Sequence, residues 1–138
     1  MRIRNWVFCT LFLSSFQLNA QLPAGTKAPA IRLPNVAGKF ISLDSLKGQW
    51  VLVDFWASWC KPCRAENPNL ISLYSNWKDN GLEIVSISVD KEEDKQKWLN
   101  AIEEDQLTWL QAWDKDKIAN KDYGITSIPR TFLVDDTG

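Results

Sequence analysis

Two cysteines three residues apart are the part of this sequence best suited to chemistry. Cys60 and Cys63 follow a nearly continuous apolar run over 50–56 and precede residues with helical spacing, so they lie where a buried strand gives way to a helix. The unpaired backbone N–H groups and positive dipole end of such a helix start stabilise a thiolate on Cys60. A stabilised thiolate attacks and leaves readily, as thiol–disulfide exchange requires. We therefore predict that Cys60 is the attacking nucleophile and Cys63, one turn deeper, the resolving thiol.

Three simpler sites compete with redox exchange at this pair. A zinc half-site needs two more ligands, and the chain has no His and no other Cys except Cys9. A structural disulfide over so short a loop would constrain little of the unfolded chain. A copper-delivery site usually includes His or Met, and the single Met is the first residue. The pattern favours redox exchange, with no metal and no cofactor, and the absence of His excludes Ser–His–Asp and Cys–His catalysis.

Residues next to the pair have two interpretations each. Lys61 and Arg64 add positive charge near Cys60 if their side chains point that way, and Pro62 falls in the first helical turn, where a missing N–H costs nothing. Trp59 is either packing at the rim or a substrate contact beside an exposed thiol.

Two carboxylates complete the candidate site. Asp54 interrupts the most apolar strand, which predicts a buried acid with a raised pKa that exchanges a proton with Cys63; the alternative is an acid at the strand end facing solvent. Glu66 lies one helical turn after Cys63, where it either tunes thiol acidity or complements the helix dipole.

The first twenty residues have the layout of a secretory signal peptide. Arg2 and Arg4 form a positive start, an apolar stretch covers 6–16, and Ala20 offers a small residue for cleavage. A membrane anchor is the alternative, for which the apolar stretch is short. Cleavage would remove Cys9 and leave Cys60 and Cys63 as the only cysteines, so we expect a periplasmic or otherwise extracytoplasmic protein.

Length and pattern predict one α/β domain over 21–138. The chain has 138 residues and a formal net charge of -1, which gives no electrostatic indication of nucleic-acid or membrane-surface binding. Strands are expected near 31–33, 50–56, 82–89, 108–112 and 131–134, with a turn at 35–38 and a helical turn at 44–48. Helices are expected over 61–80, kinked at Pro68, and over 92–104 and 115–122. This alternation predicts parallel pairing.

Three segments resemble a known family. Residues 53–63 are similar to the active-site stretch of thioredoxin-fold proteins, 64–68 resemble the exported TlpA/ResA-type branch, and 127–134 resemble the family segment that contains a cis-proline. The Ile128–Pro129 bond is accordingly a candidate cis peptide. The resemblance implies a thioredoxin-like α/β fold with a central mixed sheet flanked by helices. The family continues with an edge strand and a final helix, both of which we expect this chain to lack after Gly138.

The resemblance also implies roles and partners. Pro129 would be the cis-proline whose loop faces the dithiol and lets substrate backbone pair beside it, and Glu66 would match the active-site Glu of the branch. We expect the substrate to contact Trp59, Pro62, Ile128 and Pro129. Asp54 matches the buried Asp of general thioredoxins, where some TlpA/ResA-type members carry an amide. We expect a monomeric disulfide reductase that receives electrons from a membrane thiol carrier and acts on disulfide-containing proteins of the envelope or on cytochrome c maturation thiols.

Other functions stay open at this stage. An oxidant or isomerase would use the same site, and a truncated binding remnant would keep the motif without turnover. A peroxidase of a related fold is disfavoured, because Val53 and Ala57 stand where its Pro and its Thr or Ser are required.

Overall fold

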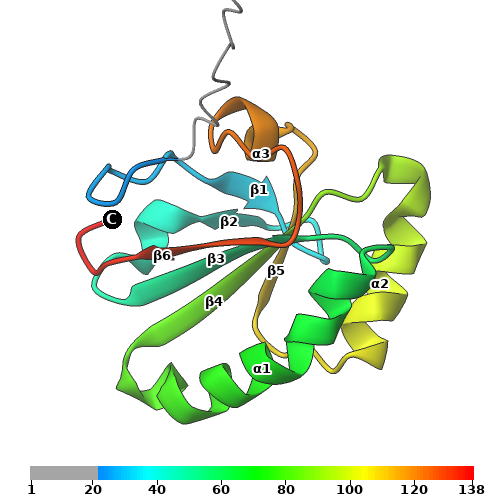
Figure 1. Cartoon of the computed structure of the whole chain (residues 1–138), viewed down its shortest axis with the longest axis horizontal. Coiled ribbons are helices and arrows are strands. Elements are labelled where there is room, and N and C mark those ends of the chain that lie inside the picture. Colours follow the sequence, from blue (N-terminus) through cyan, green and yellow to red (C-terminus); the bar gives the residue numbers. More distant parts are fainter. Residues whose placement is uncertain (1–21) are drawn as a thin grey trace, which may run out of the picture.

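Four strands form the central sheet of the computed structural model, which describes residues 22–138. Across the sheet they are β5 (Leu110–Trp113), β4 (Leu82–Ser88), β3 (Trp50–Trp56) and β6 (Arg130–Val134) (Figure 1). The first three are parallel, and β6 runs antiparallel to β3. The mixed sheet implied by the family resemblance is confirmed, whereas parallel pairing is wrong for the last strand.

The last strand runs opposite to the other three. The segment between β5 and β6 contains α3 (Ile118–Lys121), a helix of 4 residues, which spans only about 6 Å. The chain enters β6 at the end of the sheet where β3 finishes: Arg130 pairs with Phe55 and Val134 with Val51. The predicted helix over 115–122 is thus real but shorter.

A small hairpin precedes the sheet. Strands β1 (Arg32–Pro34) and β2 (Phe40–Ser42) pair antiparallel around the predicted turn. The side-chain oxygen of Asn35 accepts hydrogen bonds from the backbone N–H groups of Ala37 and Lys39, which fixes this turn. A short 3-10 helix (Leu43–Leu46) follows, where the helical turn is predicted.

The two faces of the sheet bury different clusters. The hairpin and α3 cover one face, on which Val51, Val53 and Phe55 of β3 are buried. Helices α1 (Lys61–Trp77) and α2 (Lys95–Glu104) cover the other face, where Trp56, Cys60 and Cys63 belong to the buried cluster (Figure 1). Pro68 lies inside α1, and short 3-10 segments extend α1 over Lys78–Asn80 and precede α2 over Glu92–Asp94.

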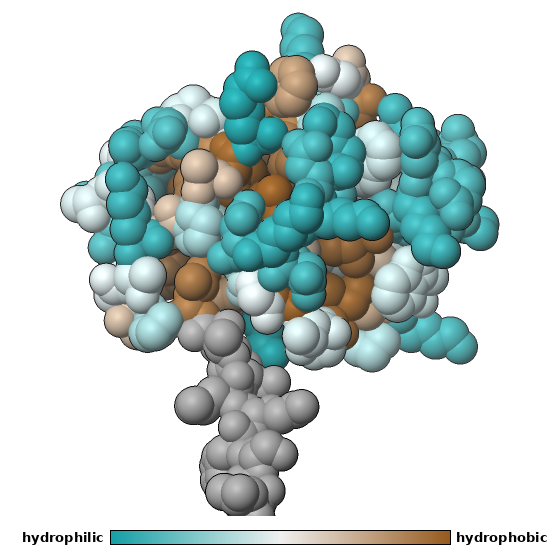
Figure 2. Space-filling view, turned by 90° about the horizontal axis from the view of Figure 1, so that it is seen from above, coloured by the Kyte–Doolittle hydropathy of each residue, from teal (hydrophilic) through white to brown (hydrophobic). Residues whose placement is uncertain are grey.

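Part of the apolar surface is open to solvent. Trp50, Trp77 and Leu133 are exposed and line a groove of about 410 Å³ beside β6, one of the two edge strands of the sheet. Figure 2 shows a face of the molecule on which hydrophobic patches lie between hydrophilic side chains. Within residues 22–138 no helix is long and apolar enough to cross a membrane. The predicted signal peptide lies outside the described residues.

Candidate active site

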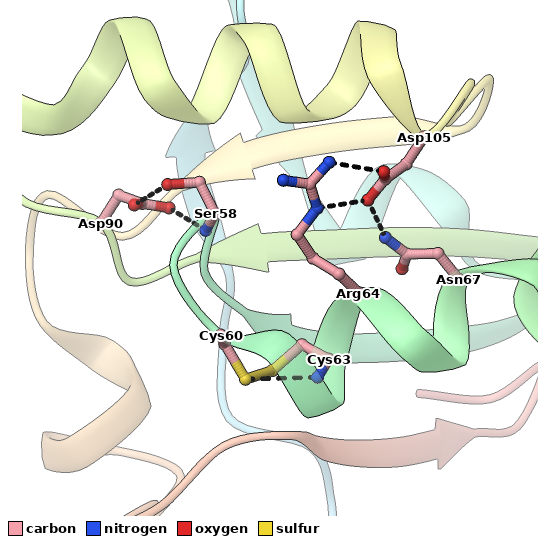
Figure 3. The surroundings of a disulfide bond; sticks show 7 residues. All are labelled: Ser58, Cys60, Cys63, Arg64, Asn67, Asp90 and Asp105. Carbon is pink, nitrogen blue, oxygen red and sulfur yellow. Dashed lines mark hydrogen bonds and ion pairs between the residues drawn. A yellow bond between two sulfur atoms is a disulfide. The ribbon is translucent and has the colours of Figure 1, made fainter.

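Cys60 and Cys63 lie at the junction between β3 and α1, joined by a disulfide (Figure 3). Cys60 is the N-cap residue of α1, and its Sγ accepts a hydrogen bond from the Cys63 backbone N–H at 3.3 Å. Pro62 occupies the first turn, where the helix needs no N–H donor. Only 4% of Cys60 and 3% of Cys63 is exposed. The helix start therefore directs a backbone donor at the Cys60 sulfur while the fold covers most of both side chains.

A buried carboxylate anchors the loop that leads into Cys60. Asp90 follows β4, and it accepts hydrogen bonds from the Ser58 backbone N–H at 2.8 Å and from the Ser58 hydroxyl at 2.6 Å (Figure 3). Ser88 donates a further hydrogen bond to Asp90 at 2.6 Å. Sequence reasoning missed Asp90. The available signal was a carboxylate just after an apolar strand, whereas Asp54 stood out as a carboxylate inside one.

The side chain of Arg64 extends from α1 toward the end of α2 (Figure 3). Its Nε and Nη2 donate to the two carboxylate oxygens of Asp105 at 2.8 and 2.6 Å, and Nη2 also donates to Glu104 at 2.8 Å. These bonds raise the pKa of Arg64, and the Arg64 bond lowers the pKa of Asp105. Asn67, buried on the next turn, donates to Asp105 at 2.7 Å. Arg64 is expected to add positive charge beside Cys60 if its side chain points that way, and this condition is not met, because the side chain binds two acids at the end of α2.

Asp54 is buried in the middle of β3. Its exposure is 4%, and the Ser86 hydroxyl of β4 donates to its Oδ2 at 3.0 Å. Burial raises the pKa of Asp54 from its usual 3.8 to about 6, and the Ser86 bond opposes this rise. Its neighbours Leu52 and Trp56, which share its side of the strand, pack in the cluster that holds both cysteines. The buried acid with a raised pKa is confirmed, whereas its exchange of a proton with Cys63 stays a prediction.

Glu66, Trp59 and Pro62 lie on the surface around the disulfide. The carboxylate of Glu66 accepts a hydrogen bond from the Asn69 side chain at 3.0 Å. Trp59 is 61% exposed although it is adjacent to the buried Cys60. An apolar surface next to a reactive sulfur suits contact with a protein substrate, and the roles of these three residues stay predictions.

The Ile128–Pro129 peptide bond is cis, as predicted. Ile128 packs against the cluster that contains both cysteines, and Pro129 is exposed. Because β6 begins beside the C-terminal end of β3, the cis-proline segment lies at the same end of the sheet as Cys60. The fold thus brings together the disulfide, Asp54 and the cis-proline segment, while Glu66 lies at the surface.

The chemistry of this arrangement is that of two sulfurs. Residues 22–138 hold no group of three or more His, Cys, Asp or Glu side chains arranged to bind a metal ion. A disulfide at a helix start can accept and return two electrons, and a backbone donor at one sulfur favours the thiolate that begins exchange.

Comparison with known proteins identifies the family. The AhpC/TSA family model matches residues 24–138. The chain is 33% identical over 129 residues to the thiol-disulfide oxidoreductase ResA of Bacillus cereus, covering 94% of this chain and 73% of the relative. It is 38% identical over 117 residues to the thiol:disulfide interchange protein HelX of Rhodobacter capsulatus, covering 83% and 64%.

A solved structure agrees with these relatives. The crystal structure of the thioredoxin domain of a thiol-disulfide oxidoreductase from Bacteroides vulgatus matches with a TM-score of 0.79 and 40% identity, over 86% of this chain and 85% of that chain. With the Cys60–Cys63 disulfide at the start of α1, these matches show that the chain belongs to the thioredoxin-like AhpC/TSA family and is a thiol–disulfide oxidoreductase of the TlpA/ResA type.

Proposed function

We propose that this oxidoreductase is exported and acts as a disulfide reductase through Cys60 and Cys63. The observation that carries exchange through this pair is the position of Cys60 at the N-cap of α1, where the Cys63 N–H donates to its sulfur. The neutralisation of Arg64 by Asp105 and Glu104 supports the reducing direction. A nearby free cation would stabilise the thiolate and make the pair more oxidising, and this cation is already paired.

The reaction transfers two electrons to the substrate. The Cys60 thiolate attacks one sulfur of a substrate disulfide, a mixed disulfide forms, and the other substrate sulfur leaves as a thiolate. Cys63, once deprotonated, attacks the Cys60 sulfur, releases the second substrate thiol and closes the Cys60–Cys63 disulfide. A membrane thiol carrier then reduces this disulfide and restores the dithiol.

Asp54 is the proposed acceptor of the Cys63 proton. Its raised pKa of about 6 lies close to neutral pH, where a group exchanges protons most effectively. Glu66, at the surface one turn after Cys63, is proposed to tune the acidity of the thiols through its charge.

The proposed substrates are disulfide-containing proteins of the cell envelope, including cytochrome c maturation thiols. They would contact Trp59, Pro62, Ile128 and Pro129, the apolar residues around the disulfide. The layout of residues 1–20 supports export, and we propose that the chain works as a monomer.

A redox titration tests the direction of the reaction. We expect a reversible two-electron transition of the pair at about -270 mV or below, in the range of reducing thioredoxins. Trp fluorescence would follow the transition, because Trp56 and Trp59 flank the site, and the mass after alkylation would confirm each point. A transition near -120 mV, typical of a strong oxidant, would reverse the direction, and a folded sample without any transition would favour a binding remnant.

Trapping tests the roles of the two cysteines. Cys63→Ser is expected to accumulate mixed disulfides through Cys60, because the resolving thiol is absent, while the matched Cys60→Ser variant accumulates none. Mass spectrometry of the trapped species would identify the cysteine and the substrate. Mixed disulfides formed only by Cys60→Ser would exchange the two roles.

A further inference from the structure

Two consecutive hydrogen bonds form a line that runs along one face of the sheet and ends on Asp54. The Trp109 indole N–H donates to Ser86 Oγ at 2.9 Å, and the Ser86 hydroxyl is 3.0 Å from Asp54 Oδ2. An indole nitrogen can only donate, and an ionised carboxylate can only accept. The Ser86 hydrogen is therefore directed at Asp54 whenever Asp54 is ionised, and the line has a single polarity.

The fold fixes all three members of this line. Asp54, Ser86 and Trp109 are each at least 95% buried. Asp54 and Ser86 are register partners on β3 and β4, so their side chains point to the same face of the sheet. The ring of Tyr74 on α1 packs edge-on against Trp109, with centroids 5.7 Å apart. The Ser86 hydroxyl is thus held in place by strand pairing on one side and by an anchored indole on the other.

We propose that Ser86, oriented by Trp109, is a positioning residue that holds the Asp54 carboxylate in one orientation and favours its ionised form. This inference deepens the proposed function and rests on the role of Asp54 given there. Ser86 itself touches neither cysteine in the proposed reaction, and it acts through Asp54.

The surroundings of Asp54 leave Ser86 as the group that opposes burial. On α1 the titratable groups of this face are Cys63 and Tyr74, with Glu83 of β4 beside Tyr74. On β6, Arg130 pairs with Phe55 and so points to the opposite face of the sheet. Among the described residues, burial raises the pKa of Asp54 and the Ser86 hydrogen bond lowers it, and no charged side chain contributes to the shift.

Ser86→Ala tests the proposal directly. Loss of a hydrogen bond to a buried carboxylate is expected to raise the pKa of Asp54 by about one pH unit. Carbon-13 NMR of the aspartate carboxyls in the oxidised protein would measure this, because the disulfide leaves no cysteine to titrate beside Asp54. Ser88→Ala is the matched control, since Ser88 is equally buried on the same face of β4 but bonds to Asp90.

Two further variants test the same hydrogen bonds if Ser86→Ala folds poorly. Ser86→Thr keeps the hydroxyl and is expected to retain the wild-type pKa of Asp54. Trp109→Phe keeps an aromatic ring but removes the donor, so the hydroxyl can rotate and the pKa is expected to rise by less than in Ser86→Ala. An unchanged pKa in both Ser86→Ala and Trp109→Phe, or an equal rise in Ser88→Ala, would overturn the proposal.

The rate of mixed-disulfide resolution separates this inference from the role of Asp54 as proton acceptor. If Ser86 positions Asp54 and Asp54 accepts the proton, the pH–rate profile of Ser86→Ala moves to higher pH by the same amount as the titration of the Asp54 carboxyl signal. A shifted carboxyl signal with an unchanged pH–rate profile would support the positioning by Ser86 and contradict the proton transfer by Asp54.

Discussion

Asp54 is an acid at a position where its ionised form destabilises the fold. It is buried on the most apolar strand, and within residues 22–138 its carboxylate accepts one side-chain hydrogen bond, from Ser86. A buried carboxylate normally requires several donors or a cation to offset the loss of water. The retention of an acid with so little compensation fits a catalytic role better than a structural one.

The free energy of unfolding should show this cost as a dependence on pH. The pKa of Asp54 is about 6 in the folded protein against a usual 3.8, so the folded state binds more protons between these values. The contribution of Asp54 to the free energy of unfolding is therefore most favourable below about pH 4. It falls as pH rises through 6, by about 3 kcal/mol in all. Asp54→Asn is expected to remove that loss, which urea unfolding of the oxidised protein at pH 4 and pH 8 would measure. An equal decrease in stability between the two pH values in wild type and variant would contradict the assignment.

At the scale of elements, both ends of the α2 segment are tied to the active site. Before α2, Asp90 binds the loop that precedes Cys60, and after α2, Asp105 binds Arg64 and Asn67 of α1 (Figure 3). The helix that packs over the sheet thus also fixes the backbone on either side of the disulfide.

The tie at Asp105 should contribute measurably to stability. Asp105→Asn removes the negative charge and one of the two oxygens that accept from the partly exposed Arg64, and we expect a loss of stability of about 1–2 kcal/mol. Glu104→Gln is the matched control: Glu104 bonds to the same guanidinium, but its side chain is 63% exposed, so its loss should be about 0.5 kcal/mol or less. Because Arg64 lowers the pKa of Asp105, the difference should be present at neutral pH and disappear as pH falls below that pKa. Equal losses in the two variants would show that Asp105 has no special role.

The sequence predicts the elements that depend on local pattern. The run over 50–56 is β-branched and apolar on both faces, and it forms β3 with the expected bounds. The helical spacing after Cys60 predicts α1 despite Pro68. The direction of β6 depends instead on its pairing with β3, a strand far away in the chain, which local pattern does not contain.

The active site likewise contains features that neighbouring residues predict and features that depend on distant parts of the chain. The position of Cys60 and Cys63 at a helix start and the burial of Asp54 follow from neighbouring residues. The partners of Ser58 and Arg64 are 32 and 41 residues away in sequence, and only the packing of α2 determines them. The sequence leaves the direction of the Arg64 side chain open, and the fold directs it to two carboxylates.

For the whole molecule, folding and redox state are linked through one thermodynamic cycle. If the folded chain favours the disulfide more than the unfolded chain does, the folded pair is more reducing than the unfolded pair, and 30 mV corresponds to about 1.4 kcal/mol. The fold gives a reason for this preference: both sulfurs lie in an apolar cluster, and the sheet face beneath carries an acid with a pKa of about 6. A new thiolate is less favourable near an ionised carboxylate than a neutral disulfide is.

We therefore expect the oxidised protein to be more stable than the reduced protein at pH 8. Urea unfolding with and without a dithiol reductant would measure the two midpoints, and the Cys60→Ser/Cys63→Ser double variant, whose midpoint should not respond to the reductant, is the control. The difference between the urea midpoints of the oxidised and reduced protein should decrease below pH 6, where Asp54 is protonated. In Asp54→Asn this difference should change little with pH. A reduced form more stable than the oxidised form would mean that the fold favours the dithiol, as in an oxidant, and would contradict the reductase whatever the details of its site.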